Sequence, residues 1–376
     1  MRTDQFIGHW GPKLTRWALR IALAVFALLF VSASVIPAFA QYKRTVLASN
    51  QPGAPNTDKT HLLNAWGLVA LPSSPWWVND NASGFSTVYT NTGQQAPLFV
   101  TVPPAPGSRA GTLGTPTGIV GNISTNTVDF VISEDGTSGQ AIFIFATLDG
   151  TISGWNPVVD GISSAGLSHA TLVVDRSSLG ASYTGLAIAT NKKGETRLYA
   201  ADDSANRRVD VFDGSFHHVK SFDDPQIPKD FTPYGIQTID GEIWVTYTAL
   251  NNAPGGFVDV FDLDGHLIRH FGRRDAPFNS PWGIALAPAN FGPLSHAILI
   301  SNNVPVDGRV NAFDRHTGEF LGPLRDDEGK PIEIDQLWGI AFGLGGSSNG
   351  ATNQLFFTAG PSNYADGRFG VIALAH

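Results

Sequence analysis

The chain has 376 residues with no cysteine, a formal net charge of −8, 42% apolar residues and only 15% charged residues. The charged share lies well below the usual value of about 25%, and together with 41 glycines and 24 prolines it is typical of a turn-rich β protein. The absence of cysteine excludes a fold held by disulfides, so a hydrophobic core alone has to stabilise the chain.

Residues 1–40 have the pattern of a targeting segment. Four basic residues lie within the first 20, the stretch 21–31 is almost wholly apolar, and Ala38-Phe39-Ala40 matches the small-x-small pattern of a signal-peptidase site. A retained membrane anchor is the alternative, but the apolar run is shorter than the roughly 20 residues that a spanning helix needs. We therefore expect a cleaved signal peptide, export to the periplasm or the extracellular space, and no stable membrane span after cleavage.

Removal of residues 1–40 would leave 20 Lys and Arg against 31 Asp and Glu, a net charge of −11. Binding to nucleic acid depends on basic side chains that displace counterions from the phosphates. A chain this acidic is therefore not expected to have a nucleic-acid partner.

A strand-like segment, YKRTVLAS (residues 42–49), comes next, and a repeated phrase begins after it. The phrase is a glycine followed by an aliphatic residue, and it occurs six times at intervals of 48 to 67 residues. A neutral polar residue stands three positions before each glycine. The six pairs are Gly67-Leu68, Gly118-Ile119, Gly185-Leu186, Gly235-Ile236, Gly283-Ile284 and Gly339-Ile340.

Each phrase is followed by a short apolar strand and a polar loop, and in three units by the pattern V-x-x-F-D. Tight turns are expected at Asp213-Gly214, Asp264-Gly265 and Thr317-Gly318, because Asp-Gly between alternating apolar residues favours type I′ hairpins. Each unit thus supplies four strands in about 50 residues, which is the organisation of a propeller blade. The longest interval predicts an insertion near residues 123–138.

The sequence therefore predicts an all-β fold, a six-bladed β-propeller of four-stranded antiparallel blades that spans residues 41–376 as one domain. Each repeated glycine would lie on the innermost strand of its blade, where a Cβ would crowd the neighbouring backbones. The last unit holds only three strands after Gln336. We expect residues 42–49 to pair with the strand near 367–374, so that the N- and C-terminal strands close the ring and remove a free edge.

These residues carry a resemblance. The stretch LYAADDSANRRVDVFD resembles an NHL-repeat blade, and the phrases NAWGL, IFATLDGTISGWNP, TGLAI and LWGIAFG together resemble an uncharacterised family of exported bacterial propeller proteins. Some members of that family carry a PEP-CTERM sorting tail, which the ending FGVIALAH does not match. The resemblance implies the fold and export, and it implies no activity.

Candidate binding residues lie at the start of the inner strands. Trp66, Tyr234, Trp282 and Trp338 directly precede repeated glycines, and Asn64 stands at the polar position of the first phrase. Aromatic rings beside amides suit a sugar, a peptide or a protein surface. The alternative is that these rings wedge between blades and never contact solvent.

Candidate metal ligands lie in the loops that should reach the same face: Asn79, Asp80, Asp202, Asp203, Asn302 and Asn303. Calcium takes six to eight oxygen ligands, which such loops could supply. The polar column nearest the axis contains no carboxylate, however, so we expect no cofactor and keep calcium as the alternative.

Two function classes remain open. The first is a monomeric, non-catalytic binding or scaffold protein of the cell envelope or extracellular space, which meets a protein, peptide or carbohydrate ligand at the channel mouth. The second is a metal-dependent hydrolase of lactone or ester type. The missing axial carboxylates favour the first class.

Overall fold

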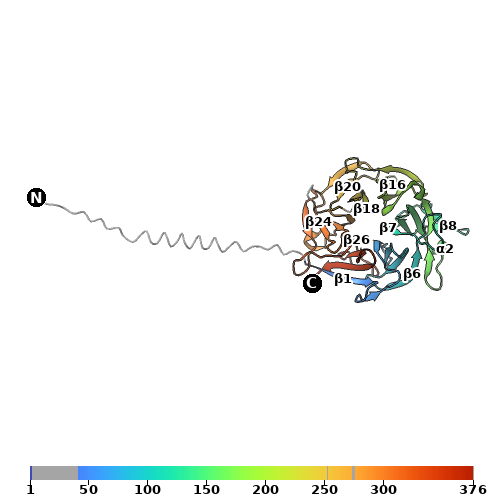
Figure 1. Cartoon of the computed structure of the whole chain (residues 1–376), viewed down its shortest axis with the longest axis horizontal. Helices are drawn as coiled ribbons and strands as arrows, with labels where there is room; N and C mark the ends of the chain where they lie inside the picture. The colour runs from blue at the N-terminus through green and yellow to red at the C-terminus, as the bar shows by residue number, and fades with distance from the viewer. Residues whose placement is uncertain (2–40, 252, 273–275, 376) are drawn as a thin grey trace. The chain divides into compact units, whose positions relative to one another are not determined.

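The computed structural model describes Met1 and residues 41–251, 253–272 and 276–375. The blades lie in a ring around a common axis (Figure 1), and each of the six main sheets is antiparallel through its four blade strands. The predicted six-bladed β-propeller is therefore confirmed. The signal-peptide prediction falls on residues 2–40, outside the described residues. Within the described part of the chain, no helix has the length and apolar character needed to span a bilayer.

The strands of each blade follow one another from the channel outwards. Blades 1 to 3 consist of β3 (Ala65–Val69), β4 (Trp76–Asp80), β5 (Phe85–Tyr89) and β6 (Gln95–Thr101); β7 (Pro116–Gly121), β10 (Phe143–Thr147), β11 (Thr151–Trp155) and β13 (Thr171–Asp175); and β14 (Tyr183–Thr190), β15 (Thr196–Asp202), β16 (Arg208–Phe212) and β17 (His218–Phe222). Blades 4 and 5 consist of β18 (Phe231–Ile239), β19 (Glu242–Ala249), β20 (Phe257–Phe261) and β21 (Leu267–Phe271); and β22 (Pro281–Leu286), β23 (Ile298–Asn302), β24 (Val310–Phe313) and β25 (Phe320–Pro323).

Blade 6 closes the ring with strands from both ends of the sequence. It consists of β26 (Leu337–Phe342), β27 (Leu355–Ala359), β28 (Arg368–Leu374) and, outermost, β1 (Tyr42–Ser49). β1 runs antiparallel to β28, with Tyr42 opposite Leu374 and Ser49 opposite Arg368. The predicted pairing of residues 42–49 with the final strand is confirmed.

Five small elements depart from the four-strand pattern. β2 (Asn56–Thr57) adds a fifth strand to blade 6, and β12 (Leu167–His169) pairs in parallel with β6 of blade 1. β8 (Val131–Glu134) and β9 (Thr137–Gln140) form a separate hairpin in the region where the insertion was predicted. The helix α2 (Pro157–Asp160) follows β11, with Asn156 as its N-cap.

The repeated glycines lie on the six inner strands, β3, β7, β14, β18, β22 and β26, as predicted. A Cβ built on Gly235 would lie 1.9 Å from the carbonyl oxygen of Trp282 in the next blade, and one on Gly67 would lie 2.3 Å from that of Thr117. Neighbouring inner strands therefore approach too closely at this level for a side chain.

Six hydrophobic clusters form the core, and each contains or contacts one of the aliphatic residues that follow the repeated glycines. Ile236 packs with Tyr199 and Ile243, which belong to blades 3 and 4, and Ile340 packs with Leu299 and Phe357, which belong to blades 5 and 6. The aliphatic residue after each glycine thus packs between blades, which confirms its predicted role.

The turns after V-x-x-F-D lie where predicted, but they are longer than two-residue type I′ turns. After β20, the backbone N–H of Asp262 donates to the His266 carbonyl, and its Oδ1 accepts from the N–H groups of Asp264 and His266 at 2.8 and 2.9 Å. In the turn after β16 it is Phe216, with φ 62°, and not Gly214 that takes the left-handed conformation. In all three turns the aspartate that ends the motif holds the loop with its carboxylate.

Candidate functional site

Four aromatic side chains meet in the channel near the starts of the inner strands; we call this group, Trp66, Tyr234, Trp282 and Trp338, the aromatic plug. Trp66 and Trp338 stack with ring centroids 3.6 Å apart and planes at 17°. Trp282 meets both rings edge-on, at 6.4 and 5.9 Å. Tyr234 lies 5.7 Å from Trp338. The sequence placed these residues at one channel mouth, and the structure brings them into contact with one another.

Hydrogen bonds fix two of the indole rings. Trp338 Nε1 donates to Asn64 Oδ1 at 2.9 Å, and Trp282 Nε1 donates at 3.1 Å to the carbonyl of Thr184, which lies in blade 3. The latter bond connects blade 5 to blade 3 across the channel. The buried Trp66 Nε1 has no hydrogen-bond partner among the described residues.

Burial divides the aromatic plug into two pairs. Trp338 is 1% exposed and Trp66 is 5% exposed, whereas Tyr234 and Trp282 are half-buried. A ring that keeps part of its surface open can contact a ligand, and a fully buried ring contributes mainly to stability. The predicted binding role of the five residues, Asn64 included, stays a prediction.

Irregular backbone turns the tryptophans into the channel. Asn64, Ser280 and Gln336, each two residues before a tryptophan, have φ values of 48°, 45° and 50°, which non-glycine residues rarely adopt. The strand register also shifts across each tryptophan, for example between Leu337 and Ile340. Such bulges re-aim side chains, here toward the axis.

A left-handed turn lies against the aromatic plug. Ser362, Asn363 and Tyr364 have consecutive φ values of 60°, 56° and 65°. The Tyr364 ring lies 5.6 Å from that of Trp338, and its hydroxyl donates to Asn303 Oδ1 at 2.9 Å. Left-handed conformation costs about 1–2 kcal/mol per residue, and such strain concentrates at functional sites.

Of the six predicted metal ligands, Asp203 and Asn303 lie near the aromatic plug. Asn303 Nδ2 donates to the carbonyl of Leu337, and its Oδ1 accepts from Tyr364. Burial and the neighbouring charge of Asp202 raise the pKa of Asp203, although Ser182 opposes them. Both residues carry the polar character that the sequence predicted for this face.

The other four predicted ligands each have hydrogen-bond partners, but one buried side-chain oxygen of Asn79, of Asp80 and of Asn302 has none among the described residues. Asn79 Nδ2 donates to the carbonyls of Thr117 and Gly118 in blade 2, so it joins two blades. Asp80 accepts from Thr87 at 2.6 Å, and burial raises its pKa well above the ordinary value. Asp202 accepts from Asn206 and from two backbone N–H groups, and Asn302 donates to the Pro277 carbonyl.

Two groups of acidic and histidine side chains come close enough to hold a metal ion among the described residues, and neither contains a predicted ligand. One consists of Glu134, Asp160 and His169, and the other of Asp224, Asp259 and His270. Both lie outside the channel lining. A calcium site at the predicted residues stays a prediction.

The half of the channel beyond the repeated glycines is an apolar cavity of about 580 Å³. The aliphatic residue of every phrase lines it, Trp282 contributes from the aromatic plug, and Gln237, Thr238 and Asp240 add polar groups. Asp240 is its single ionisable lining residue among the described residues. This cavity was not predicted from the sequence, since the aliphatic residues of the phrases were expected only to pack between blades.

Comparisons with known proteins identify relatives without a known activity. No family model matches the chain. Two uncharacterised proteins of Acanthamoeba polyphaga mimivirus, R648 and L690, are each 29% identical to it, over 88% and 89% of this chain and 80% and 86% of their own lengths. A third, R640, is 33% identical over 56% of this chain and 40% of its own length. These relatives lend no support to the bacterial exported origin or to the sorting-tail link.

Solved structures of similar shape are distant. Virginiamycin B lyase from Staphylococcus aureus has a TM-score of 0.47 and 12% identity, and covers 89% of this chain and 100% of its own. BBS1N, solved in complex with ARL6DN, has a TM-score of 0.45 and 10% identity, with 89% and 98% coverage. The WD40 β-propeller domain of Doa1 has a TM-score of 0.43 and 12% identity, with 88% and 97% coverage. At this level of similarity no function transfers to the chain.

Proposed function

We propose that this chain is a non-catalytic binding protein whose channel holds a small apolar molecule. The β-propeller fold fits a binding or scaffold role. The observation that carries the proposal is the cavity of about 580 Å³, lined by aliphatic residues from all six blades. Cavities of about 300–1,000 Å³ with mostly apolar walls and a few polar groups are typical of small-molecule sites.

The aromatic plug gives this cavity a floor. Trp282 lines the cavity and also packs against Trp66 and Trp338, so a ligand that enters from the ends of the inner strands would meet an aromatic surface. Ile123 and Leu344, both substantially exposed, lie at the wall near those strand ends. Gln237 and Asp240 would orient a polar group of the ligand.

Export is part of the proposal. The basic start, the apolar run and Ala38-Phe39-Ala40 support cleavage after Ala40, with the mature protein in the periplasm or the extracellular space. The test is N-terminal sequencing of protein recovered from the medium or the periplasm, which should begin at Gln41. Recovery of the chain with Met1 intact in the membrane fraction would contradict export with cleavage.

A second candidate keeps binding but places it at the channel mouth on the aromatic side, with a protein, peptide or carbohydrate ligand. The strained turn at Ser362–Tyr364 favours it, because the turn holds Tyr364 against Trp338. The hydrolase alternative has less support. Asp240 is the single carboxylate among the described residues of the cavity wall, and acid–base hydrolysis needs a pair of positioned groups.

A neutral fluorescent probe tests the proposal. N-phenyl-1-naphthylamine should bind the wild-type chain with enhanced emission, and Gln237→Trp, which places a large ring in the cavity from an exposed position, should weaken binding at least tenfold. Gln94→Trp, at an exposed turn of blade 1, is the matched control and should bind normally. Equal binding by both variants would overturn the cavity proposal. Loss of binding in Tyr234→Ala alone would favour the channel mouth.

A further inference from the structure

A second polar cluster lies where blade 3 meets blade 4, outside the channel. Asp259 is on β20, His270 is on the neighbouring strand β21, and Asp224 follows the outer strand β17 of blade 3. His270 Nδ1 lies 2.8 Å from Asp259 Oδ1 and 3.5 Å from Asp224 Oδ2. One ligand atom from each of the three residues falls within 4.8 Å of the others.

The two carboxylates are buried without a full set of partners. Asp259 is 1% exposed and Asp224 is 5% exposed, yet the Oδ2 atom of each has no hydrogen bond among the described residues. The Tyr247 hydroxyl, on a residue that is 2% exposed, lies beside these carboxylates without a well-formed hydrogen bond. Buried polar atoms without partners are rare in native proteins, so an ion or a water molecule is expected to meet these atoms.

The corresponding position in blade 3 shows what a buried aspartate requires here. Asp210 stands in the same V-D-V-F sequence as Asp259. Its carboxylate lies 3.0 Å from Arg176 Nε and 2.8 Å from Arg208 Nε, and it accepts from Tyr183 and Ser221. Two cations and two hydroxyls therefore satisfy Asp210.

Blade 4 lacks both of these cations. Arg176 follows the outer strand β13 of the preceding blade, and the residue that reaches Asp259 from just after the outer strand β17 is Asp224, a second acid. Phe257 stands two residues before Asp259, as Arg208 stands two before Asp210. The carboxylates of Asp224 and Asp259 therefore need a positive charge nearby. Among the described residues, only His270 supplies one.

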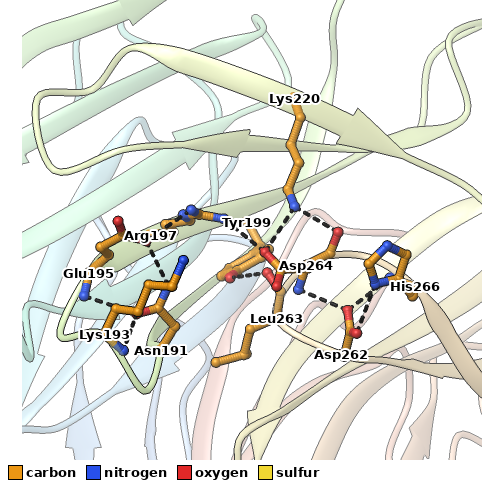
Figure 2. Close-up of polar contacts among 10 residues, drawn as sticks. All are labelled: Asn191, Lys193, Glu195, Arg197, Tyr199, Lys220, Asp262, Leu263, Asp264 and His266. Carbon is orange, nitrogen blue, oxygen red and sulfur yellow. Dashed lines mark hydrogen bonds and ion pairs between the residues drawn. The ribbon is translucent and has the colours of Figure 1, made fainter.

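At the turn between β20 and β21, by contrast, cationic side chains lie close to the acidic Asp264. Figure 2 shows Lys220 of blade 3 reaching the Asp264 carbonyl at 2.6 Å, with Arg197 at 3.3 Å from the Asp264 carboxylate. Tyr199 donates to the Leu263 carbonyl at 2.9 Å. Cationic side chains thus join blades 3 and 4 at the turn, while acids meet further along β20 and β21.

We propose that Asp224, Asp259 and His270 bind one divalent transition-metal ion, with zinc as the best fit, and that the ion joins blades 3 and 4. Zinc accepts imidazole nitrogen together with carboxylate oxygen in a four-coordinate site. The half-exposed His270 leaves a path to solvent and room for a water as the fourth ligand. The Tyr247 hydroxyl would donate to the free oxygen of Asp259. Calcium fits less well, because it takes six to eight oxygens.

The test uses the full-length protein, stripped with EDTA and then freed of chelator. Zinc chloride titrated by calorimetry should bind one ion at this site, and zinc should raise the melting temperature by several degrees, since a ligand of the folded state stabilises it. His270→Gln, which retains a donor for Asp259, should weaken zinc binding at least tenfold and abolish the rise. His218→Gln, a histidine on the matching outer strand of blade 3, should retain both effects.

Four results would overturn the proposal. The first is an absence of stoichiometric zinc binding, and the second is a melting temperature that calcium raises and zinc does not. The third is an equal zinc-dependent rise of the melting temperature in His270→Gln and wild type. The fourth is a rise that is lost in His169→Gln but kept in His270→Gln. The last would assign the ion to Glu134, Asp160 and His169 instead. A circular dichroism spectrum of each variant at 25 °C checks that it is folded.

Discussion

Trp66 of the first blade and Trp338 of the last stack face to face, with ring centroids 3.6 Å apart. The ring of blades is therefore joined in the channel as well as at its edge, where β1 pairs with β28. Trp282 meets both rings edge-on and lines the apolar cavity, so the aromatic plug lies against that cavity.

The first prediction separates structural from exposed rings in the aromatic plug. Trp338→Ala should lower the free energy of unfolding by about 4 kcal/mol, because a fully buried indole is lost and a cavity remains. Trp282→Ala should cost less than half as much, since its ring is half-buried. Guanidinium unfolding curves measure both values. An equal loss of unfolding free energy in the two variants would contradict the division of the aromatic plug into buried and half-buried rings.

The second prediction concerns the closest approach of the inner strands. Gly235→Ala should destabilise the protein by several kcal/mol, about the range of severe core overpacking, because its Cβ would lie 1.9 Å from the Trp282 carbonyl oxygen. Gly185→Ala is the matched control, since its nearest neighbours lie 3.1 and 3.2 Å away and can shift slightly. Thermal melts compare the two variants. A lower melting temperature for Gly185→Ala than for Gly235→Ala would contradict the claim that the inner strands approach most closely at Gly235.

The fold was predictable because its strongest constraint is local in sequence. Each close approach of inner strands demands a glycine, and each gap between blades takes the aliphatic residue beside it, so Gly67-Leu68 and its equivalents reveal the blades. The turn geometry was less accessible. Phe216 rather than Gly214 adopts the left-handed conformation, and Gly214 instead allows the close approach of the Asp129 carboxylate, which is far away in sequence.

The candidate site was predictable in composition and not in geometry. Trp66 and Trp338 were placed at one channel mouth, but their stacking accompanies a left-handed backbone at Asn64 and Gln336, whose side chains accept from the Trp338 indole and from the Tyr364 backbone N–H. Likewise Asp210 and Asp259 share the sequence V-D-V-F. Besides Arg208, which Phe257 replaces, they differ in whether Arg176 or Asp224 arrives from the preceding blade, a tertiary fact that the motif does not contain.

The third prediction is a pH dependence at Asp210. Burial alone would raise the pKa of this carboxyl, but Ser221, Tyr183 and the two arginines outweigh burial and hold the pKa below the ordinary value of 3.8. Asp210 therefore stabilises the folded state above the unfolded pKa, and this contribution is lost as the pH falls through the folded pKa.

Asp210→Asn should accordingly cost about 3 kcal/mol at pH 7, since it leaves Arg176 without its buried partner. The difference from wild type should shrink as the pH falls from 5 toward 3. Urea unfolding at several pH values measures it. A difference that stays constant over this range would show that the charge of Asp210 is not the cause.

The fourth prediction tests ring closure. A chain that begins at Gln51 lacks β1 and should melt at a lower temperature and aggregate, because β28 becomes an open edge and several ladder hydrogen bonds, each worth about 1 kcal/mol, are lost. A chain that begins at Gln41 keeps β1 and is the control. Light scattering and calorimetry compare the two. Identical melting and solubility would mean that β1 does not close the ring.

The most direct test of the central claim is to locate an apolar ligand in the channel. Crystals soaked with 1-bromonaphthalene should show one bromine anomalous peak inside the cavity, between Trp282 and the ring of aliphatic residues that includes Ile119 and Ile236. The peak should vanish in crystals of Gln237→Trp. Bromine found only at other surfaces, or a channel that stays empty while the compound binds in solution, would contradict the account.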